Sequence, residues 1–283
     1  MGLLDNRKIV ITGGSMGIGL AVAKKCADEG ARLILVSRHK EDLVKAVKGI
    51  GGSERGHSFQ CLDVSISEKV KESADSILRA DGYIDGLVNC AGIYGPIGKT
   101  EEIDPAAFVN TININLLGTF YMCHYFAPLL KKAKRGKIVN YSGGGAAGPF
   151  PNYSAYAVSK VGIVKLTENI ALELKNDRID ANAVAPGFVV TRLHQQTIKA
   201  GHRAGEDFLQ KTMNHIAKGG VPADLAAQLT VFLLSAKSDD ITGKFISAPW
   251  DRWSEKDFVT KLKKDKDFAT LRRIDDKMFS KKV

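Results

Sequence analysis

The stretch Ile9–Gly30, IVITGGSMGIGLAVAKKCADEG, decides the fold. It opens with a short β-branched apolar run that ends in glycine, which is typical of a buried parallel strand. A turn with Gly13, Gly17 and Gly19 follows, and the residues from 20 to 29 then have helical spacing. This order predicts an anion site, because the helix directs free N–H groups toward a phosphate. We predict that a dinucleotide is held here by Gly13, Ser15, Gly17, Ile18 and Gly19.

A second apolar strand, Arg32–Val36, ends at Ser37-Arg38. The end of this strand reaches the adenosine ribose in a dinucleotide-binding fold, where a carboxylate would favour a free 2′-hydroxyl. Here a guanidinium stands instead, and arginine binds phosphate through charge-assisted hydrogen bonds. We therefore predict NADP(H) rather than NAD(H) as the cofactor. The alternative is that Arg38 is a solvated residue at the start of the next helix.

Further strands alternate with helical segments along the chain, which predicts an α/β fold with a single doubly wound parallel sheet of about seven strands. The remaining strands are predicted at Ser58–Leu62, Ile84–Val88, Lys137–Asn140, Ile179–Val184 and Lys244–Ser247. Ligands bind at the carboxyl ends of strands in such sheets. We expect Asp63, Val64, Asn89, Ala91 and Gly92 to contact the cofactor there. The helical segment 105–131 contains two asparagines, which are poor mid-helix residues, and is predicted to be irregular.

Tyr156 and Lys160 stand four residues apart at the start of a helix, and therefore on the same helix face. A lysine ammonium stabilises a nearby phenolate, so we expect Lys160 to lower the pKa of Tyr156 and make it a useful acid or base. Tyr153 has no such partner, because residue 157 is alanine. It is predicted to pack or to line the pocket.

Together these motifs resemble the classical short-chain dehydrogenase/reductase family over residues 5 to about 247. The resemblance rests on TGxxxGxG at Thr12–Gly19, Asp63, NxAG at Asn89–Gly92, Asn115, Tyr156-x-x-x-Lys160 and Pro186-Gly187. It implies a Rossmann-type fold and hydride transfer between a nicotinamide and an alcohol or carbonyl, with Tyr156 as acid/base. By the same resemblance, Lys160 also holds the nicotinamide ribose and Asn115 supports a water-linked proton relay. The implied contacts to the nicotinamide end are Pro186, Gly187, Val189 and Thr191.

One position departs from the family pattern. The family usually places a serine thirteen residues before the tyrosine, and residue 143 here is glycine. Ser142, one position earlier, is the nominal catalytic serine if the glycine-rich loop shifts register to present it. Otherwise another donor polarises the carbonyl, such as Ser154, Tyr153 or a backbone N–H of Gly143–Gly145. A third interpretation is a catalytically weak NADP(H)-binding sensor or scaffold.

The predicted domain organisation is one Rossmann-type domain over residues 1–249, followed by a helical C-terminal extension over 250–283. Within the domain, residues 188–219 are predicted as a long, irregular substrate lid rich in basic residues, which allows an anionic substrate. The extension begins near Trp250 and Trp253. It is expected to cover the core or a partner subunit, or else to close both tryptophans over a substrate.

Composition and residue spacing argue against nucleic-acid-binding, membrane-spanning and metal-binding proteins. The chain of 283 residues has a net charge of +10, but no zinc-finger spacing or continuous basic run before its tail, so we expect no nucleic-acid partner. The apolar runs are too short for membrane spans, and no metal site is predicted. Four widely spaced cysteines and the lack of a signal peptide suggest a cytoplasmic protein.

The family resemblance implies a homodimer or homotetramer. A sugar-nucleotide epimerase or dehydratase ranks last, because its usual glycine pattern is missing.

Overall fold

Seven parallel strands form one sheet in the order β3-β2-β1-β4-β5-β6-β7 in the computed structural model, which describes residues 2–274. The strands are β1 (Lys8–Thr12), β2 (Arg32–Ser37), β3 (Ser58–Cys61), β4 (Gly86–Asn89), β5 (Gly136–Tyr141), β6 (Ile179–Ala185) and β7 (Phe245–Ser247). The strand order reverses between β1 and β4, as in doubly wound dinucleotide-binding folds. The predicted fold class is confirmed.

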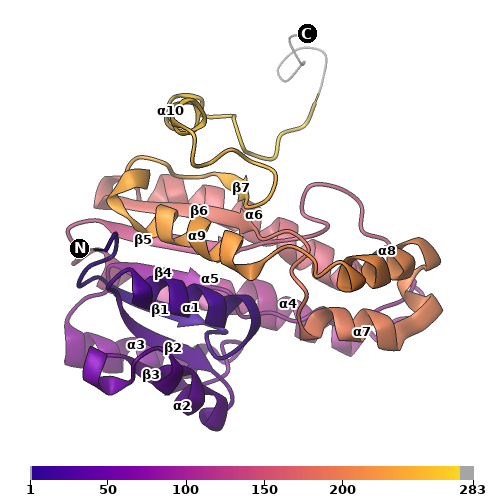
Figure 1. The fold of residues 1–283 in the computed structure, drawn as a ribbon, viewed down its shortest axis with the longest axis horizontal. Coiled ribbons are helices and arrows are strands. Elements are labelled where there is room, and N and C mark those ends of the chain that lie inside the picture. Colours follow the sequence, from indigo (N-terminus) through magenta and orange to yellow (C-terminus); the bar gives the residue numbers. More distant parts are fainter. Residues whose placement is uncertain (1, 275–283) are drawn as a thin grey trace.

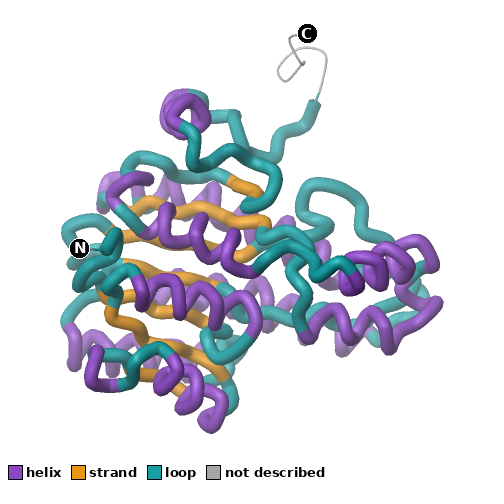
Figure 2. Tube along the Cα trace, viewed as in Figure 1, coloured by secondary structure: helices purple, strands orange, loops and turns teal. Residues whose placement is uncertain are grey.

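Helices cover both faces of this sheet (Figures 1 and 2). On one face lie α1 (Gly17–Asp28), α2 (Lys40–Gly49) and α9 (Ala223–Leu234), which share one apolar cluster with the sheet. On the other face, α3 (Ser67–Asp81), α5 (Gly118–Leu130) and α6 (Ser154–Glu173) share the second cluster. Ile9 and Ile11 of β1 join the first cluster, whereas Val10 joins the second. The uninterrupted apolar run of β1 follows from this burial on both faces.

The predicted irregularity in segment 105–131 is a turn of π-helix at Asn113–Leu117, between α4 (Pro105–Ile112) and α5. Asp104 caps α4 by accepting the N–H of Ala106 at 2.9 Å, and proline occupies the first helical position. The π turn alters the direction of the side chains that it carries, Asn115 among them.

Residues 188–219 differ from the expected irregular segment. They form two helices, α7 (Arg192–Ala200) and α8 (Glu206–Ala217), which lie side by side to the right of the sheet in Figure 1. Thr191 caps α7 in a reciprocal arrangement with His194, three residues on. The sequence does not show α7 as an apolar stripe, because two of the three residues on its buried face, His194 and Thr197, are polar.

The C-terminal extension covers the edge strand β7. The N–H of Phe245 donates to the carbonyl of Ala269 at 2.7 Å. Trp253 packs beside Phe232 of α9 and donates its indole N–H to a main-chain carbonyl. The extension's helix, α10 (Lys256–Lys264), lies beyond β7 in Figure 1. The extension thereby occupies a backbone donor of the edge strand, which disfavours pairing with a strand of another chain. Residues 275–283 of the predicted extension lie outside the described part of the chain.

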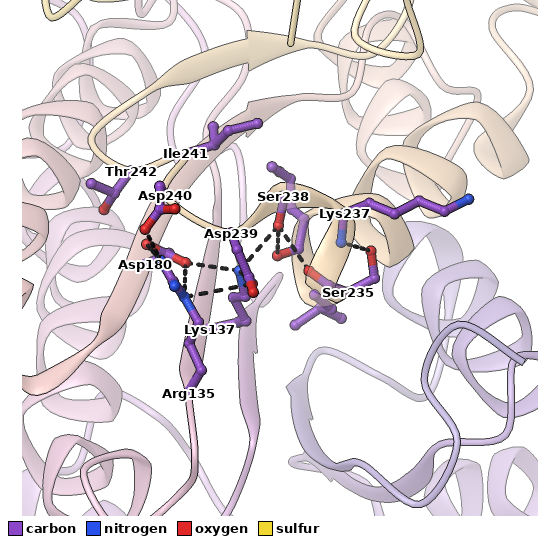
Figure 3. Close-up of polar contacts among 12 residues, drawn as sticks. Arg135, Lys137, Asp180, Ser235, Lys237, Ser238, Asp239, Asp240, Ile241 and Thr242 are labelled. Carbon is purple, nitrogen blue, oxygen red and sulfur yellow. Dashed lines mark hydrogen bonds and ion pairs between the residues drawn. The ribbon is translucent and has the colours of Figure 1, made fainter. Parts of the chain in front are cut away.

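A cluster of charges ties the amino ends of β5 and β6 to the segment before β7 (Figure 3). The Lys137 ammonium, fully buried, lies 2.8 Å from carboxylate oxygens of both Asp180 and Asp239. Arg135 pairs with Asp180 at 2.8 Å and with Asp240. These strand ends are opposite to the ends at which ligands bind in parallel sheets, so the cluster has a structural role.

Within residues 2–274, no helix is long and apolar enough to cross a membrane. In the same range, no group of three or more His, Cys, Asp or Glu side chains could hold a metal ion.

Candidate active site

The glycine turn has the backbone geometry that a close approach to phosphate requires. Gly13 and Gly17 have φ values of +65° and +54°, in the left-handed region that favours glycine. A Cβ atom at Gly19 would lie 2.3 Å from the carbonyl oxygen of Gly13, so only glycine fits where α1 begins. Among the described residues, no side chain caps the N-terminus of α1. Its first N–H groups are therefore available to an anion, and the turn fits a pyrophosphate.

A cleft of about 340 Å³ runs from this turn across the carboxyl ends of β1, β2 and β4 to the start of α7. The predicted cofactor residues that line it are Gly13, Ser15, Gly17, Ile18, Gly19, Ser37, Arg38, Asp63, Val64, Ala91, Gly92 and Thr191. The predicted cofactor residues that do not line it are Asn89, Tyr156, Lys160, Pro186, Gly187 and Val189. Asn89 is buried and donates to Asn140 of β5 at 2.9 Å, which makes it a strand-to-strand contact.

At the end of β2, the Arg38 guanidinium lies 3.7 Å from a carboxylate oxygen of Asp63, and about half of its side chain is exposed. The hydroxyl groups of Ser15 and Ser37 are 3.0 Å apart and join the glycine turn to this strand end. Among the cleft residues that the sequence did not assign to the cofactor, two are basic: His39 beside Arg38 and Arg192 at the start of α7. Each of them follows a residue that the sequence assigned to the cofactor, Arg38 or Thr191, and this position is the signal that the sequence offered. The cleft therefore contains two arginines, which suits an anionic ligand.

Tyr156 and Lys160 lie together on the first turns of α6. The Lys160 ammonium is 5.4 Å from the centre of the Tyr156 ring and donates to the carbonyl of Tyr141 at 2.8 Å. Both side chains are buried, with 8% of Tyr156 and 5% of Lys160 exposed. The carbonyl at the end of β5 thus fixes the ammonium beside the phenol.

The expected lowering of the Tyr156 pKa is absent. Burial, with a smaller contribution from Cys90, raises the pKa of Tyr156 above its ordinary value. Burial also lowers the pKa of Lys160 to about 8. The physical reason is that loss of solvent penalises the charged form of each group, and in Tyr156 this exceeds any stabilisation by the neighbouring ammonium.

Asn115, from the π turn, holds the loop that follows β4. Its amide oxygen accepts the N–H of Ile93 at 2.8 Å, and its amide nitrogen donates to the Ile93 carbonyl at 2.9 Å. The same nitrogen donates to Ser159 of α6 at 3.0 Å. The side chain therefore connects β4 to the helix that carries Tyr156 and Lys160.

Ser142 is directed away from Tyr156. Its buried hydroxyl donates to the carbonyl of Lys160 at 2.9 Å. A Cβ atom at Gly143, by contrast, would lie 2.8 Å from Tyr156 Oη. The residue beside the phenol is therefore Gly143 and not Ser142.

The other hydroxyl groups considered as donors also have partners elsewhere. Tyr153 lies 2.8 Å from the hydroxyl of Thr197 on α7, and Ser154 lies 3.3 Å from that of Thr100. Within residues 2–274, the backbone N–H groups of Gly143–Gly145 donate to no protein acceptor. Of the alternatives drawn from the sequence, these N–H groups are the free donors nearest to Tyr156.

A second, larger cavity of about 610 Å³ adjoins the nucleotide cleft, with Ile93 and Gln196 lining both. We call it the outer cavity. It lies between the loop after β4 and helix α7, and its lining includes Gly95, Ile97, Lys199, Ala200 and Arg203. Tyr156 lines neither the outer cavity nor the nucleotide cleft.

The fold and these contacts define a dinucleotide-binding α/β protein with a tyrosine–lysine pair beside its nucleotide cleft. Comparison with known proteins gives the family: the short chain dehydrogenase model matches residues 7–201. The chain is 34% identical to a 3-oxoacyl-(acyl-carrier-protein) reductase of Thermotoga maritima over 245 residues, 86% of this chain and 96% of that protein. It therefore belongs to the short-chain dehydrogenase/reductase family, whose members are oxidoreductases that use NAD(H) or NADP(H).

Other relatives agree on the family and differ in substrate. A D-threitol dehydrogenase of Mycolicibacterium smegmatis is 31% identical over 244 residues, 85% of this chain and 90% of that protein. The crystal structure of an NAD⁺-bound xylitol dehydrogenase matches with a TM-score of 0.78 and 27% identity, covering 86% of this chain and 98% of that one. The named substrates differ widely, so relatives alone do not select one for this chain.

Proposed function

We propose that this protein is an NADP(H)-dependent oxidoreductase that interconverts an alcohol and a ketone or aldehyde. The observation that carries the proposal is the arrangement of Tyr156 against the Gly143 backbone, with Lys160 fixed beside the phenol by Tyr141. A nicotinamide cofactor, when bound, donates hydride to the carbonyl carbon or accepts it from the alcohol. Tyr156 donates a proton to the resulting oxygen in reduction and takes it back in oxidation.

Two kinds of group polarise the substrate oxygen in this proposal. The Tyr156 hydroxyl is one, and the free backbone N–H groups of Gly143–Gly145 are the other. Backbone donors of this type stabilise developing charge on oxygen without the need for reorganisation. They replace the serine hydroxyl of the family pattern, because position 143 has no side chain.

The preference for NADP(H) is proposed from the charge at the end of β2. Arg38 has a half-exposed guanidinium in the nucleotide cleft, with His39 adjacent and the carboxylate of Asp63 as its closest anionic partner. The 2′-phosphate of NADP(H) is a stronger partner for a guanidinium than a ribose hydroxyl is. NAD(H) has a ribose hydroxyl in place of the 2′-phosphate and would bind the Arg38 guanidinium less strongly.

The natural substrate is proposed to be a small molecule with an anionic group. Lys199 and Arg203 line the outer cavity, and within residues 2–274 neither forms an ion pair. Two carboxylates line it as well, but both have protein partners: Glu102 lies 3.8 Å from Lys99, and Asp104 caps α4. We also propose a cytoplasmic homodimer or homotetramer. Exposed apolar side chains on α5 and α6, including Phe120, Val158 and Val161, provide a surface on which a second copy could pack.

The test is a panel of aliphatic and aromatic ketones and aldehydes, assayed with NADPH and with NADH by cofactor absorbance. We expect turnover with NADPH, lost in Tyr156→Phe, while that variant binds NADPH as tightly as the wild type in a fluorescence titration. The matched control is Tyr153→Phe, which removes a hydroxyl from the same helix start and should keep its activity. Tight NADPH binding without turnover of any compound would instead support the sensor or scaffold interpretation.

A further inference from the structure

We propose that Tyr94 is an aromatic gate between the outer cavity and Tyr156, and that its hydrogen bond to His194 holds the gate closed. This inference rests on the proposed function, since it concerns how a substrate oxygen reaches Tyr156. The gate is assembled from two parts of the chain that are distant in sequence, the loop after β4 and helix α7.

Tyr94 lies next to both the lining of the outer cavity and the Tyr156 ring. Its two neighbours in the chain, Ile93 and Gly95, both line the outer cavity. Its own ring, 5% exposed, meets the Tyr156 ring edge-on, with centroids 4.8 Å apart at 87°. Tyr94 and Tyr156 share an apolar cluster with Ile97 and Ala200, which also line the cavity. Tyr94 itself is not among the residues that line the outer cavity, so its ring lies behind this lining and in contact with the phenol.

The hydrogen bond to α7 has a defined direction. His194 Nδ1 accepts the N–H of Thr191 at 3.3 Å, and a backbone N–H can only donate. Burial, with a contribution from His215, lowers the pKa of His194 to about 4, so the ring is neutral at pH 7. Its proton is then on Nε2, which donates to Tyr94 Oη at 3.2 Å. Among the described residues, His194 is the one hydrogen-bonding partner of that hydroxyl.

The backbone on either side of Tyr94 is fixed, so any opening uses the side chain. Asn115 binds both the N–H and the carbonyl of Ile93. Gly95 has a φ of +74°, and a Cβ atom there would overlap Thr111. Displacement of α7 would remove His194 from the Tyr94 hydroxyl and allow the ring to rotate away from Tyr156. The substrate would then pass from the outer cavity to the phenol.

Chemical accessibility of Tyr156 tests the gate without any need for turnover. Tetranitromethane nitrates accessible tyrosines through their phenolate form, which burial also disfavours. Peptide mass spectrometry follows nitration at Tyr156 over time at one fixed pH. We expect Tyr94→Ala to be nitrated there at least about tenfold faster than wild type, because the ring in contact with the phenol is removed. Tyr94→Phe keeps the ring and loses the hydrogen bond, so its rate should lie between the two. Melting temperatures establish that each variant is folded, and Tyr94→Phe decides the test if Tyr94→Ala is not.

Tyr153→Phe is the matched control. The Tyr153 hydroxyl also bonds to α7, through Thr197, but neither chain neighbour of Tyr153 lines the outer cavity. Its nitration at Tyr156 should stay within about twofold of wild type. Equal acceleration in Tyr153→Phe and Tyr94→Phe would show general loosening of α7 and overturn the gate. So would unchanged nitration in both Tyr94 variants. Failure of the proposed function would appear separately, as absence of NADPH-dependent turnover in the wild type.

Discussion

Any residue larger than glycine at position 143 would place its Cβ atom 2.8 Å from Tyr156 Oη. The phenol cannot easily retreat, because its ring is packed edge-on against Tyr94 and Phe150. Position 143 therefore sets the distance between the proton donor and the glycine-rich loop. A side chain there would alter both the phenol position and the backbone donors beside it.

For this reason we expect Gly143→Ala to lower kcat by roughly 10- to 100-fold, since small misplacements of reacting groups have effects of this size. NADPH affinity should stay unchanged, because Gly143 does not line the nucleotide cleft. Steady-state kinetics and a binding titration measure the two quantities. An unchanged kcat in Gly143→Ala would contradict the predicted contact.

Ser142→Ala is the paired variant on the adjacent residue. Its hydroxyl bonds to the Lys160 carbonyl, so we expect a loss of about 1 kcal/mol in the free energy of unfolding. Removal of an oxyanion-type donor would instead reduce kcat by about 10²–10³. A loss of that size with unchanged stability would show that Ser142 contacts the substrate after all. Urea unfolding and kcat together separate the outcomes.

Arg38→Ala should discriminate between the two nicotinamide cofactors. Hydrogen bonds to charged groups contribute about 1.5–3 kcal/mol, so NADPH affinity should fall roughly 10- to 100-fold. NADH affinity should change little. Arg192→Ala provides the comparison: its guanidinium lies 3.4 Å from Met16 Sδ over the glycine turn, where we propose that the phosphates common to both cofactors bind. We expect it to weaken both equally. Equal losses in Arg38→Ala would show that Arg38 does not bind the 2′-phosphate.

The low pKa of Lys160 predicts a specific pH dependence of stability. Burial lowers this pKa to about 8 in the folded protein, whereas an unfolded chain titrates near 10.4. Between these values the unfolded state binds more protons, so the free energy of unfolding rises with pH, by at most about 1.4 kcal/mol per unit. Lys160→Met lacks this contribution. From pH 8 to pH 9.5, the free energy of unfolding measured in urea should therefore rise more for wild type than for the variant. A difference in free energy between the two proteins that does not change with pH would exclude the lowered pKa of Lys160.

The buried charge cluster predicts a stability effect far from the active site. Lys137→Met would leave the carboxylate of Asp180, 6% exposed, with fewer partners. Loss of one member of a buried pair costs about 3–5 kcal/mol, and we expect the lower end because Arg135 also binds Asp180. Lys237→Met, on an exposed lysine shown in Figure 3, should change stability by under about 0.5 kcal/mol. Similar losses in both variants would contradict the assigned role.

The sequence by itself determined the parallel sheet, the glycine turn and the positions of Tyr156 and Lys160. Each of these depends on residues that are close in the chain: an apolar run, glycines where φ is positive, or a spacing of four on one helix. It also identified residue 143 as a departure from the family pattern. It did not predict the helices at Arg192–Ala200 and Glu206–Ala217, because polar residues such as His194, Thr197 and Thr212 occupy their buried faces.

Only the tertiary structure decided what surrounds the phenol. The Ser142 hydroxyl turns to a carbonyl eighteen residues away, and the Tyr94 hydroxyl bonds to His194 across one hundred residues. It likewise decided the pKa of Tyr156. Burial raises this pKa, whereas the sequence predicted that Lys160 would lower it. The physical reason is that side-chain partners and loss of solvent depend on which distant segments pack together. No local pattern of residues encodes that packing.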